Sequence, residues 1–234
     1  MQNYIILNGQ ISTNIQGLLI SELPPISKPR IRAEVEEIDG RDGDIITPLG
    51  YGAYDKEILI GLSYNYDINE VIAYFNTSGT VTFSNEEDKY YNYQIIEQID
   101  FERLISFKTA RVRMHIQPFK YSVEDNSKTF NITSETSIQI RNVGNIYSKP
   151  KITITGSDNI GISLNGVQLF QISLGTLGSI TIDTDKMEAY TGTTLLNRLV
   201  IGDYDNFKLN VGKNIIAWTG TISKIEIENY SRWI

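Results

Sequence analysis

The sequence predicts a mainly β protein, and three observations support this fold class. Short runs alternate apolar and polar residues along most of the chain, which is the period of half-buried strands. Turns rich in glycine and asparagine separate these runs. A single segment shows helical spacing of its apolar residues. At 234 residues the chain is long enough for one large β domain or two smaller ones.

Composition excludes several classes of protein. The chain has no cysteine, so packing rather than disulfides must stabilise the fold. Hydrophobic residues make up 41% and charged residues 21%, which is an ordinary globular balance. No apolar stretch reaches the ~18 residues of a membrane span, and the first ten residues lack the pattern of a secretory signal. We therefore expect neither a membrane anchor nor standard secretion.

The net charge of −7 lies entirely in the first half of the chain. Residues 1–128 carry 12 Lys and Arg against 19 Asp and Glu, whereas residues 129–234 carry 9 of each kind. A nucleic-acid-binding surface needs a basic patch, because phosphate contacts supply much of its affinity. We therefore expect no specific nucleic-acid binding, although this charge is consistent with a protein past which DNA merely travels.

The chain begins with a predicted β-hairpin and a proline-rich linker. Tyr4–Leu7 is the first strand, Asn8–Gln10 the turn, and Ile11–Ile20 the return. The prolines of Leu23–Ile26 favour extended backbone and remove amide donors. We therefore expect a linker or an edge segment there.

Residues 27–62 are predicted to form two strands around a glycine-rich, charged bend. Arg30–Ile38 alternates apolar and charged residues and is predicted to be a half-buried strand. Asp39–Asp44 concentrates Gly and Asp, so the chain reverses there. A loop then extends past Gly52 before a new strand starts at Ile58–Ile60. Because long ordered loops tend to be functional, this segment is either a solvated hairpin arm or an arm that packs against another copy of the protein.

One α-helix is predicted over Asp67–Asn76. Asp67 is a favourable N-cap, and Glu70 stands where its capping-box partner belongs. Gly79 follows at a position suited to a left-handed C-terminal residue. The apolar residues share one face at helical spacing, which favours packing on the core over a binding groove. They are Ile68, Val71, Ile72 and Phe75.

The first half continues as antiparallel β structure after the helix. Strands are predicted over Gly79–Ser84, Tyr90–Ile99, Phe101–Leu104 and Phe107–Gln117. The last of these alternates cleanly and ends at Pro118. The polar run Ser122–Lys128 indicates a boundary, so we expect domains at residues 1–128 and 129–234.

Beyond the boundary, many short strands with Gly and Asn turns predict a sandwich or a jelly-roll. Asn165-Gly166 and Gly212–Asn214 are examples of these turn signals. The candidate strands are Ile138–Ile140, Lys151–Thr155, Ile160–Leu164, Gln168–Ile172, Ser179–Asp183, Glu188–Tyr190, Phe207–Leu209, Asn214–Ala217 and Lys224–Glu228.

The sequence offers little catalytic chemistry. His115 is the only histidine, and its place on the polar side of a strand favours an exposed residue over a catalytic or ligand role. Carboxylates are plentiful, but none stands out as a glycosidase-like pair. Asp39–Asp44 and Asp183–Asp185 invite a calcium site, yet neither fits the EF-hand pattern and both look like turns. We therefore expect no catalytic residue, no metal and no cofactor.

Two motifs stand out, Gly40-Arg41-Asp42-Gly43-Asp44 and Gln117-Pro118-Phe119-Lys120-Tyr121. Weaker ones accompany them along the chain. These are Asn8-Gly9, Gly17-Leu18, Leu23-Pro24-Pro25-Ile26, Tyr90-Tyr91, Phe107-Lys108, Asn142-Val143-Gly144-Asn145, Ser148-Lys149-Pro150, Leu164-Asn165-Gly166, Ile182-Asp183, Gly212-Lys213-Asn214 and the closing Arg232-Trp233-Ile234. With these motifs in this order, the chain resembles the distal tail proteins of siphophages that infect Gram-positive bacteria, and the likeness covers nearly its whole length.

This resemblance implies a structural, non-enzymatic hub of a phage tail tip or baseplate. It implies an N-terminal β domain with one helix, residues 1–128, that forms a ring of six copies. A C-terminal galectin-like β-sandwich, residues 129–234, would lie on the outside. The ring would join the tail tube protein to the tail-associated lysin or tail fibre, in some phages with receptor-binding proteins at the periphery. Such a protein belongs to the virion and is assembled in the host cytoplasm.

A cyclic ring needs two different contact patches on each subunit, and the predicted arm suits one of them. We therefore expect residues of the arm and its base to lie at or beside the neighbouring subunit. The candidates are Arg41, Asp42, Asp44, Tyr51 and Tyr54. The acidic first half also suggests an acidic ring lumen that repels passing DNA.

Two other functions stay open. One is a carbohydrate-binding adhesion module for host cell-wall glycans, because the second half is rich in Asn, Thr and Tyr. The other is a glycan hydrolase. A galectin-like fold is no evidence for sugar binding, since the second half has no histidine and neither Trp218 nor Trp233 is set in a galectin sugar-binding motif.

Overall fold

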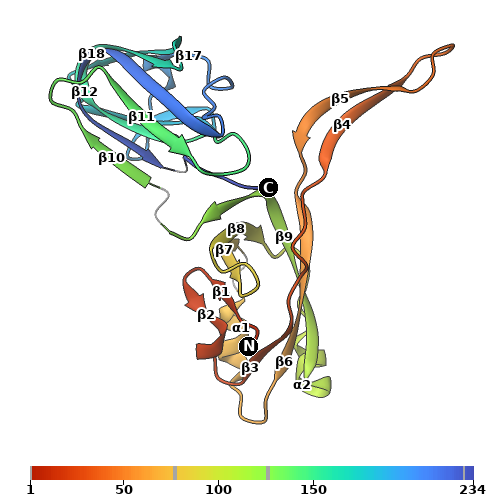
Figure 1. The fold of residues 1–234 in the computed structure, drawn as a ribbon. Coiled ribbons are helices and arrows are strands. Elements are labelled where there is room, and N and C mark those ends of the chain that lie inside the picture. The colour runs from red at the N-terminus through yellow and green to blue at the C-terminus, as the bar shows by residue number, and fades with distance from the viewer. Residues whose placement is uncertain (1, 76–77, 125–126, 229) are drawn as a thin grey trace. The chain divides into compact units, whose positions relative to one another are not determined.

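The computed structural model describes residues 2–75, 78–124, 127–228 and 230–234. It consists mostly of antiparallel strands (Figure 1), which confirms the mainly β fold class. The chain divides into two compact units, the first made of residues 1–123 together with Ile234 and the second running from Glu124 to Trp233. Residues 125 and 126 of the predicted boundary lie outside the described residues. No described helix is long and apolar enough to cross a membrane.

The first unit is built on a seven-stranded antiparallel sheet. In spatial order its strands are β2 (Gln10–Ile11), β1 (Ile5–Leu7), β7 (Ser78–Phe83), β8 (Lys89–Gln94), β9 (Thr109–Ser122), β6 (Tyr54–Leu62) and β3 (Leu18–Glu22). Its helices are the 3-10 helix η1 (Ser12–Asn14) and two α-helices, α1 (Ile68–Tyr74) and α2 (Phe101–Phe107). Buried side chains from the sheet and both α-helices form one hydrophobic core.

The predicted first hairpin is wrong in its second strand. β2 holds only two residues, and Ile20 lies in β3, which pairs with β6 at the other edge of the sheet. The cause is local, because Ser12 Oγ accepts the amide hydrogen of Ile5 at 3.1 Å and η1 turns the chain away. Gly17 completes the turn at φ +77°, where a Cβ atom would lie 2.5 Å from Tyr66 Cβ.

Helix α1 begins where its capping residue predicts. The Asp67 carboxylate accepts the amide hydrogens of Asn69 and Glu70. The Glu70 carboxylate accepts the amide hydrogen of Gln16 at 3.1 Å and does not complete a capping box, because the Asp67 amide donates to the Gln16 carbonyl. Asn76, the last residue of the predicted helix, lies outside the described residues.

The buried face of α1 differs from the prediction by one residue. Val71 and Phe75 are buried, but Ile72 is 44% exposed and Tyr74 takes its place in the core. The Tyr74 hydroxyl donates to the carbonyl oxygen of Ile5 at 3.0 Å. A tyrosine can be buried when its hydroxyl finds such an acceptor, which helical periodicity alone does not reveal.

Two further predictions for the first unit are wrong. Gly79 lies inside β7 at φ +146° and does not cap α1. Phe101–Leu104, predicted as a strand, begins α2, so the described residues of the unit form two α-helices where one was predicted. The Asp100 carboxylate caps α2 by accepting the amide hydrogen of Arg103 at 2.7 Å, and Lys108 ends it in a left-handed conformation. The aromatic and β-branched residues around this segment favour a strand, and the capping residue Asp100 is the local signal that marks the helix.

Strand β9 shows the predicted alternation and runs further than predicted. The side chains of Ala110, Val112, Met114 and Ile116 are all buried. The strand continues through Pro118 for four more residues. Pro118 falls in a bulge, because β8 pairs with residues 116 and 120 of β9 and with none between them. Its missing amide hydrogen therefore breaks no bond of the sheet.

The second unit is a nine-stranded antiparallel sheet folded into two layers. Its strands are β10 (Ser127–Asn131), β11 (Ser137–Asn142), β12 (Lys151–Leu164), β13 (Val167–Gly175), β14 (Ser179–Asp183), β15 (Glu188–Thr191), β16 (Thr194–Leu195), β17 (Val200–Gly202) and β18 (Gly212–Glu228), with a 3-10 helix η2 (Asn197–Leu199). β12 and β18 pair along nearly their whole lengths and belong to both layers. One layer runs β10-β18-β12-β14-β15-β16 and the other β11-β18-β12-β13-β17.

Bulges bend the two shared strands and thereby make a sandwich. The register between β12 and β18 shifts after Thr155 and again between Ser157 and Gly161. Gly220 faces the extra residues at φ +88°, and the carbonyl oxygen of Asn159 lies 2.3 Å from where a Cβ atom would stand. Bulges bend strands and increase their twist. Buried side chains of both layers meet in one core, as expected of a sandwich, whereas the galectin likeness stays a prediction.

The candidate strands of the second half are partly merged in the structure. Four of the nine fall in pairs within the two long strands β12 and β18. Phe207–Leu209 is no strand, because only an isolated bridge joins Leu209 to Ser148. The apolar residues of that segment are buried in the core from a loop. Asn165-Gly166 forms the predicted tight turn, with φ of +51° and +89°.

A buried arginine fixes the closing residues of the chain. Arg232 is 2% exposed, and its Nε donates to the carbonyl oxygen of Tyr147 at 2.7 Å. Its guanidinium carbon lies 4.7 Å from the centre of the Tyr147 ring, and its Nη1 lies 3.7 Å from the Asp185 carboxylate. Gly144 packs so closely that a Cβ atom there would lie 2.0 Å from the carbonyl oxygen of Arg232. Two of the sequence motifs therefore pack against each other.

We expect Arg232→Ala to destabilise the second unit by about 2–4 kcal/mol, because a buried carbonyl loses its charged donor and a cavity forms. Arg198→Ala removes an exposed arginine of η2 and serves as the control. Urea unfolding followed by circular dichroism measures the difference. Equal unfolding midpoints for the two variants would contradict this role of Arg232.

Candidate assembly site, an exposed arm and its buried base

Strands β4 (Ile31–Glu37) and β5 (Asp44–Tyr51) form a two-stranded antiparallel sheet of their own. Figure 1 shows this hairpin projecting as a long extension, and we call residues 30–52 the arm. Most of the predicted loop after the bend is therefore strand β5. The strand predicted at Arg30–Ile38 is present as β4, but all seven of its residues are exposed, so the predicted half-burial is wrong.

One face of the arm is apolar and uncovered. Cross-strand partners in an antiparallel pair point to the same side, so the register gathers three apolar pairs on one face. The pairs are Ile31 with Tyr51, Ala33 with Pro48, and Val35 with Ile46. Ile31, Val35 and Ile46 are each more than half exposed. Full burial of one such side chain contributes about 1.5–3 kcal/mol, and a lone two-stranded hairpin is only marginally stable in water. The arm would therefore be stabilised by a partner that covers this face.

The tip of the arm carries charge. Residues 30–51 include three arginines and six carboxylates, which gives the arm a net charge of −3. Arg41, Asp42 and Asp44 are exposed at the bend, where Gly40 and Gly43 adopt φ of +81° and +77°. Within the described part of the chain, these three charged side chains form no ion pair. They are available to a partner.

Contacts at its base hold the arm to the seven-stranded sheet. Tyr51 packs edge-to-face against Phe119, with ring centres 5.6 Å apart. The amide of Gly52 donates to the carbonyl oxygen of Arg30 at 2.9 Å and joins the two ends of the arm. Tyr51 and Tyr54 are partly buried. The predicted interface residues therefore divide into three at the tip and two at the base.

A cluster of buried charges lies at the base of the arm. Lys56 and Lys120 are only 4% and 5% exposed. Lys120 Nζ donates to Glu86 Oε1 at 2.7 Å, and the Tyr91 hydroxyl donates to the other oxygen of Glu86. Lys56 Nζ lies within 5.7 Å of the centres of three aromatic rings. The ring faces help to offset the cluster's second positive charge.

The same cluster fixes the proline-rich segment that leads into the arm. Lys56 Nζ donates to the carbonyl oxygen of Pro25 at 2.7 Å. The side-chain amide of Asn85 donates to the carbonyl oxygen of Pro24 at 2.9 Å. The Leu-Pro-Pro-Ile motif and Lys120 of the Gln-Pro-Phe-Lys-Tyr motif therefore meet at one place, where they anchor the arm.

Burial shifts the pKa values of this cluster. It lowers the pKa of Lys56 from 10.5 to about 8, while the Glu86 charge opposes the shift and Lys120 adds to it. Burial also raises the pKa of Tyr54 to about 12, with a further contribution from Glu86. The pKa of Tyr91 is raised by burial and by its hydrogen bond to Glu86. The two tyrosines therefore stay neutral across the physiological range.

Sequence reasoning did not find Lys56, Glu86 or Lys120, although one signal was available. Lys56 shares its strand phase with Ile58 and Ile60, which are buried. A lysine at the buried phase of an alternating strand is rare unless its charge is paired. Glu86 lies in a turn between strands, and nothing in its neighbourhood in the sequence marks it as buried.

The other candidates from the sequence show no catalytic geometry. His115 Nδ1 lies 2.9 Å from Asp55 Oδ1 on the polar side of β9, as expected of a surface strand residue. The Asp183 carboxylate accepts the amide hydrogens of Asp185 and Lys186, which is the predicted turn. Among the described residues, no group of three or more His, Cys, Asp or Glu is placed to hold a metal ion.

We expect the lowered pKa of Lys56 to make stability depend on pH. Between about pH 8 and pH 10.5 the unfolded chain keeps a proton that the native chain releases, so stability rises with pH. Above pH 10 the raised pKa of Tyr54 has the opposite effect. Tyr54 loses its proton in the unfolded chain before it does so in the native chain, so stability falls as pH rises. From pH 8 to 10, the wild type should gain about 2 kcal/mol relative to Lys56→Met.

Urea unfolding at several pH values measures this difference. Lys28→Met, which removes an exposed lysine before the arm, is the matched control and should leave the pH dependence of wild type unchanged. If Lys56→Met and wild type follow parallel curves from pH 8 to pH 10, Lys56 does not titrate as its burial implies.

Comparisons with known proteins agree with this architecture. No family model and no curated protein sequence matches the chain. Several solved structures match nearly all of it, among them the following two. One is the SPP1 Dit (gp 19.1) protein, which is described as a paradigm of the hub adsorption apparatus in phages that infect Gram-positive bacteria. It matches with a TM-score of 0.65 and 15% sequence identity, and the match covers 97% of this chain and 99% of the SPP1 chain. A chain of the phage P2 baseplate in its activated conformation with Ca has a TM-score of 0.52 and 12% identity over 97% of both chains.

At such identities the likeness concerns the fold, and it extends through both units. It agrees with the resemblance carried by the sequence motifs. The chain has the fold of the Dit hub protein of phage SPP1.

Proposed function

We propose that this chain is a subunit of the ring-shaped hub at the tip of a phage tail. The full-length fold match to a phage hub protein is the observation that carries the proposal. The second match, to a phage baseplate, supports the same role. The function is structural, and the catalytic groups that a glycan hydrolase needs are not assembled around His115 or the acidic turns.

The arm supplies the contact between neighbouring subunits. Its apolar face is uncovered in the single chain, and its charged tip residues are free to pair. Its base is clamped to the sheet by Tyr51 and by the buried Lys56 cluster, so the arm is presented in a fixed direction. A contact between an arm and a different patch on the next copy is head-to-tail, and such contacts form a ring when the rotation from copy to copy closes on itself. We infer six copies from the motif resemblance.

The remaining partners follow from the hub role. The ring joins the tail tube protein to the tail-associated lysin or tail fibre and gives receptor-binding proteins a place at the periphery. It is part of the virion tail tip and is assembled in the host cytoplasm. DNA passes through its centre without a specific contact, and acidic side chains of the first unit face that lumen. An assembled ring in which the acidic side chains of the first unit face outward would refute the acidic lumen.

The mass of the purified protein tests the ring directly. Light scattering should give six times the chain mass of 26.5 kDa, and negative-stain images should show a central hole. The tail tube protein is added if the chain alone is monomeric, because the ring then requires a template. A chain that stays monomeric with its tube protein present would overturn the hub proposal.

Lysine placed on the apolar face of the arm should disrupt the ring. Ile46→Lys buries a charge in the contact, whereas Thr47→Lys adds the same charge on the opposite face beside Glu34. Both sites are exposed in the single chain, so both variants should unfold at the same urea concentration as wild type. We expect at least a tenfold loss of ring for Ile46→Lys only, measured by light scattering. Equal loss in both variants would refute the assignment of this face.

The charged tip is tested separately. Replacing Arg41, Asp42 and Asp44 together by alanine should weaken the ring, because these exposed charges pair with the neighbouring copy. The weakening should diminish as salt rises, since exposed pairs are screened. An intact ring of unchanged stability in the triple variant would place the tip outside the contact.

A further inference from the structure

A polar groove lies on the outer face of the second unit. Thr219 of β18, Gly161 of β12 and Gln171 of β13 stand side by side in the sheet register. Their neighbours in the next row, Trp218, Ile162 and Phe170, are buried in the core, so the first row faces away from the core.

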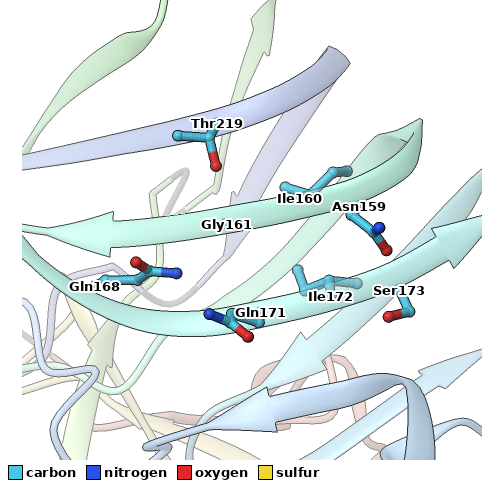
Figure 2. Close-up of a pocket in the computed structure, with 8 residues that line it drawn as sticks. All are labelled: Asn159, Ile160, Gly161, Gln168, Gln171, Ile172, Ser173 and Thr219. Carbon is cyan, nitrogen blue, oxygen red and sulfur yellow. The ribbon is translucent and has the colours of Figure 1, made fainter.

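Gly161 forms the floor of this groove. A Cβ atom there would lie 2.7 Å from Thr219 Oγ1 and 3.3 Å from Gln168 Nε2. Figure 2 shows the side chains of Asn159, Gln168, Gln171 and Thr219 arranged around this glycine on three neighbouring strands. Together with Ser173 they enclose about 350 Å³.

Bulges on both sides of Gly161 shape the groove. β12 carries extra residues opposite Gly220, just before Gly161. Ile162 of β12 pairs with Phe170 of β13, and the next residue, Ser163, pairs with Gln168. Leu169 has no partner on β12 and is therefore the extra residue of a bulge in β13. This bulge turns Gln168 to the outer face, where strict alternation would have buried it. Bulges that redirect a side chain in this way are frequent beside binding sites.

The lining of the groove is uncharged and uncommitted. Its polar side chains are three amides and two hydroxyls, those of Asn159, Gln168, Gln171, Ser173 and Thr219. Within the described residues, these side chains form no hydrogen bond to the protein. Each of them offers both a donor and an acceptor, which matches a ligand hydroxyl that also donates and accepts. A phosphate, carboxylate or cation would find no opposite charge there.

The groove continues into a second depression, which favours a chain-like ligand. Gln168 also lines this neighbouring space of about 540 Å³, together with Asn165, Asn210 and Lys208. Two charged side chains stand in its wall, Asp203, which accepts hydrogen bonds from Asn206, and Lys208, whose ammonium lies 5.3 Å from the centre of the Tyr147 ring. The uncharged groove around Gly161 is therefore the part that selects a neutral ligand. A ligand of several linked units could lie across both depressions, with Gln168 at the junction.

We propose that this groove binds a neutral polysaccharide through its hydroxyl groups. The two depressions accommodate successive sugar units, and Gln168 and Gln171 supply the central hydrogen bonds. Because the groove is open and lacks an aromatic platform, a single site binds weakly, in the millimolar range. The site lies wholly within the second unit, so it does not depend on the arm or on the hub proposal.

Saturation-transfer NMR of the full chain tests the proposal with three neutral hexasaccharides, maltohexaose, cellohexaose and chitohexaose. Hexagalacturonate, which has the same length and six carboxylates, is the charged comparator. We expect transfer to at least one neutral sugar at millimolar concentration and little to the charged one. Absence of transfer to all three neutral sugars, or transfer to hexagalacturonate only, overturns the proposal.

Variants then locate the site. Gly161→Ala puts a Cβ atom on the floor of the groove, 2.7 Å from Thr219 Oγ1 and 3.3 Å from Gln168 Nε2, so both side chains have to move, and urea unfolding checks that the variant is folded. Gln168→Ala with Gln171→Ala removes the central amides. Gln139→Ala removes an exposed glutamine of β11 in the same layer and is the matched control. At ligand concentrations well below saturation, both groove variants should lose at least about 80% of the transfer, which there equals a fivefold loss of affinity or about 1 kcal/mol, while the control retains it. Equal transfer in wild type and groove variants overturns the proposal.

Discussion

The buried cluster of Lys56, Glu86 and Lys120 is the interaction on which the geometry of the first unit depends. A buried ion pair loses much of its Coulomb attraction to desolvation, and apolar residues in its place often give equal stability. Charge adds direction here, because an ammonium group donates to particular carbonyl oxygens. Lys56 donates to the carbonyl oxygen of Pro25, and the Asn85 side chain donates to that of Pro24. The segment that leads into the arm therefore has one position on the sheet instead of several.

A fixed base matters because the arm cannot determine its own direction. Its two strands pair only with each other, and apart from Tyr51, which packs on Phe119, the residues of its apolar face are exposed in the single chain. An arm free to swing would lose conformational entropy on meeting a partner, which would weaken the contact. Clamping it through Tyr51 and Phe119 and through the Gly52 amide removes part of that cost before assembly. The buried cluster and the exposed face therefore serve the same contact in the proposed ring.

Sequence patterns predicted those parts of the molecule in which local and tertiary preferences agree. The alternation in β9, the N-cap at Asp67 and the Asn165-Gly166 turn are all local signals. The failures occur where a distant contact decides. Tyr74 is buried because the Ile5 carbonyl accepts its hydroxyl, 69 residues away in sequence. The base of the arm was missed for the same reason, since Lys56, Glu86 and the prolines are adjacent only in the folded chain.

Sequence patterns did not predict the groove for the same reason. Gln168 occupies the core phase of β13 in a strict alternation, and only the bulge at Leu169 brings it to the surface. Gly161 reads as an ordinary strand glycine until its neighbours across the sheet are known. Bulges also create the bend that lets β12 and β18 serve both layers. Linked weak sites can exceed a single site in apparent affinity by orders of magnitude when geometry lets them engage one surface together, as six grooves in a ring of six copies would if they face the same polysaccharide. A groove with millimolar affinity would then suffice for attachment, while each single contact could still release and rebind.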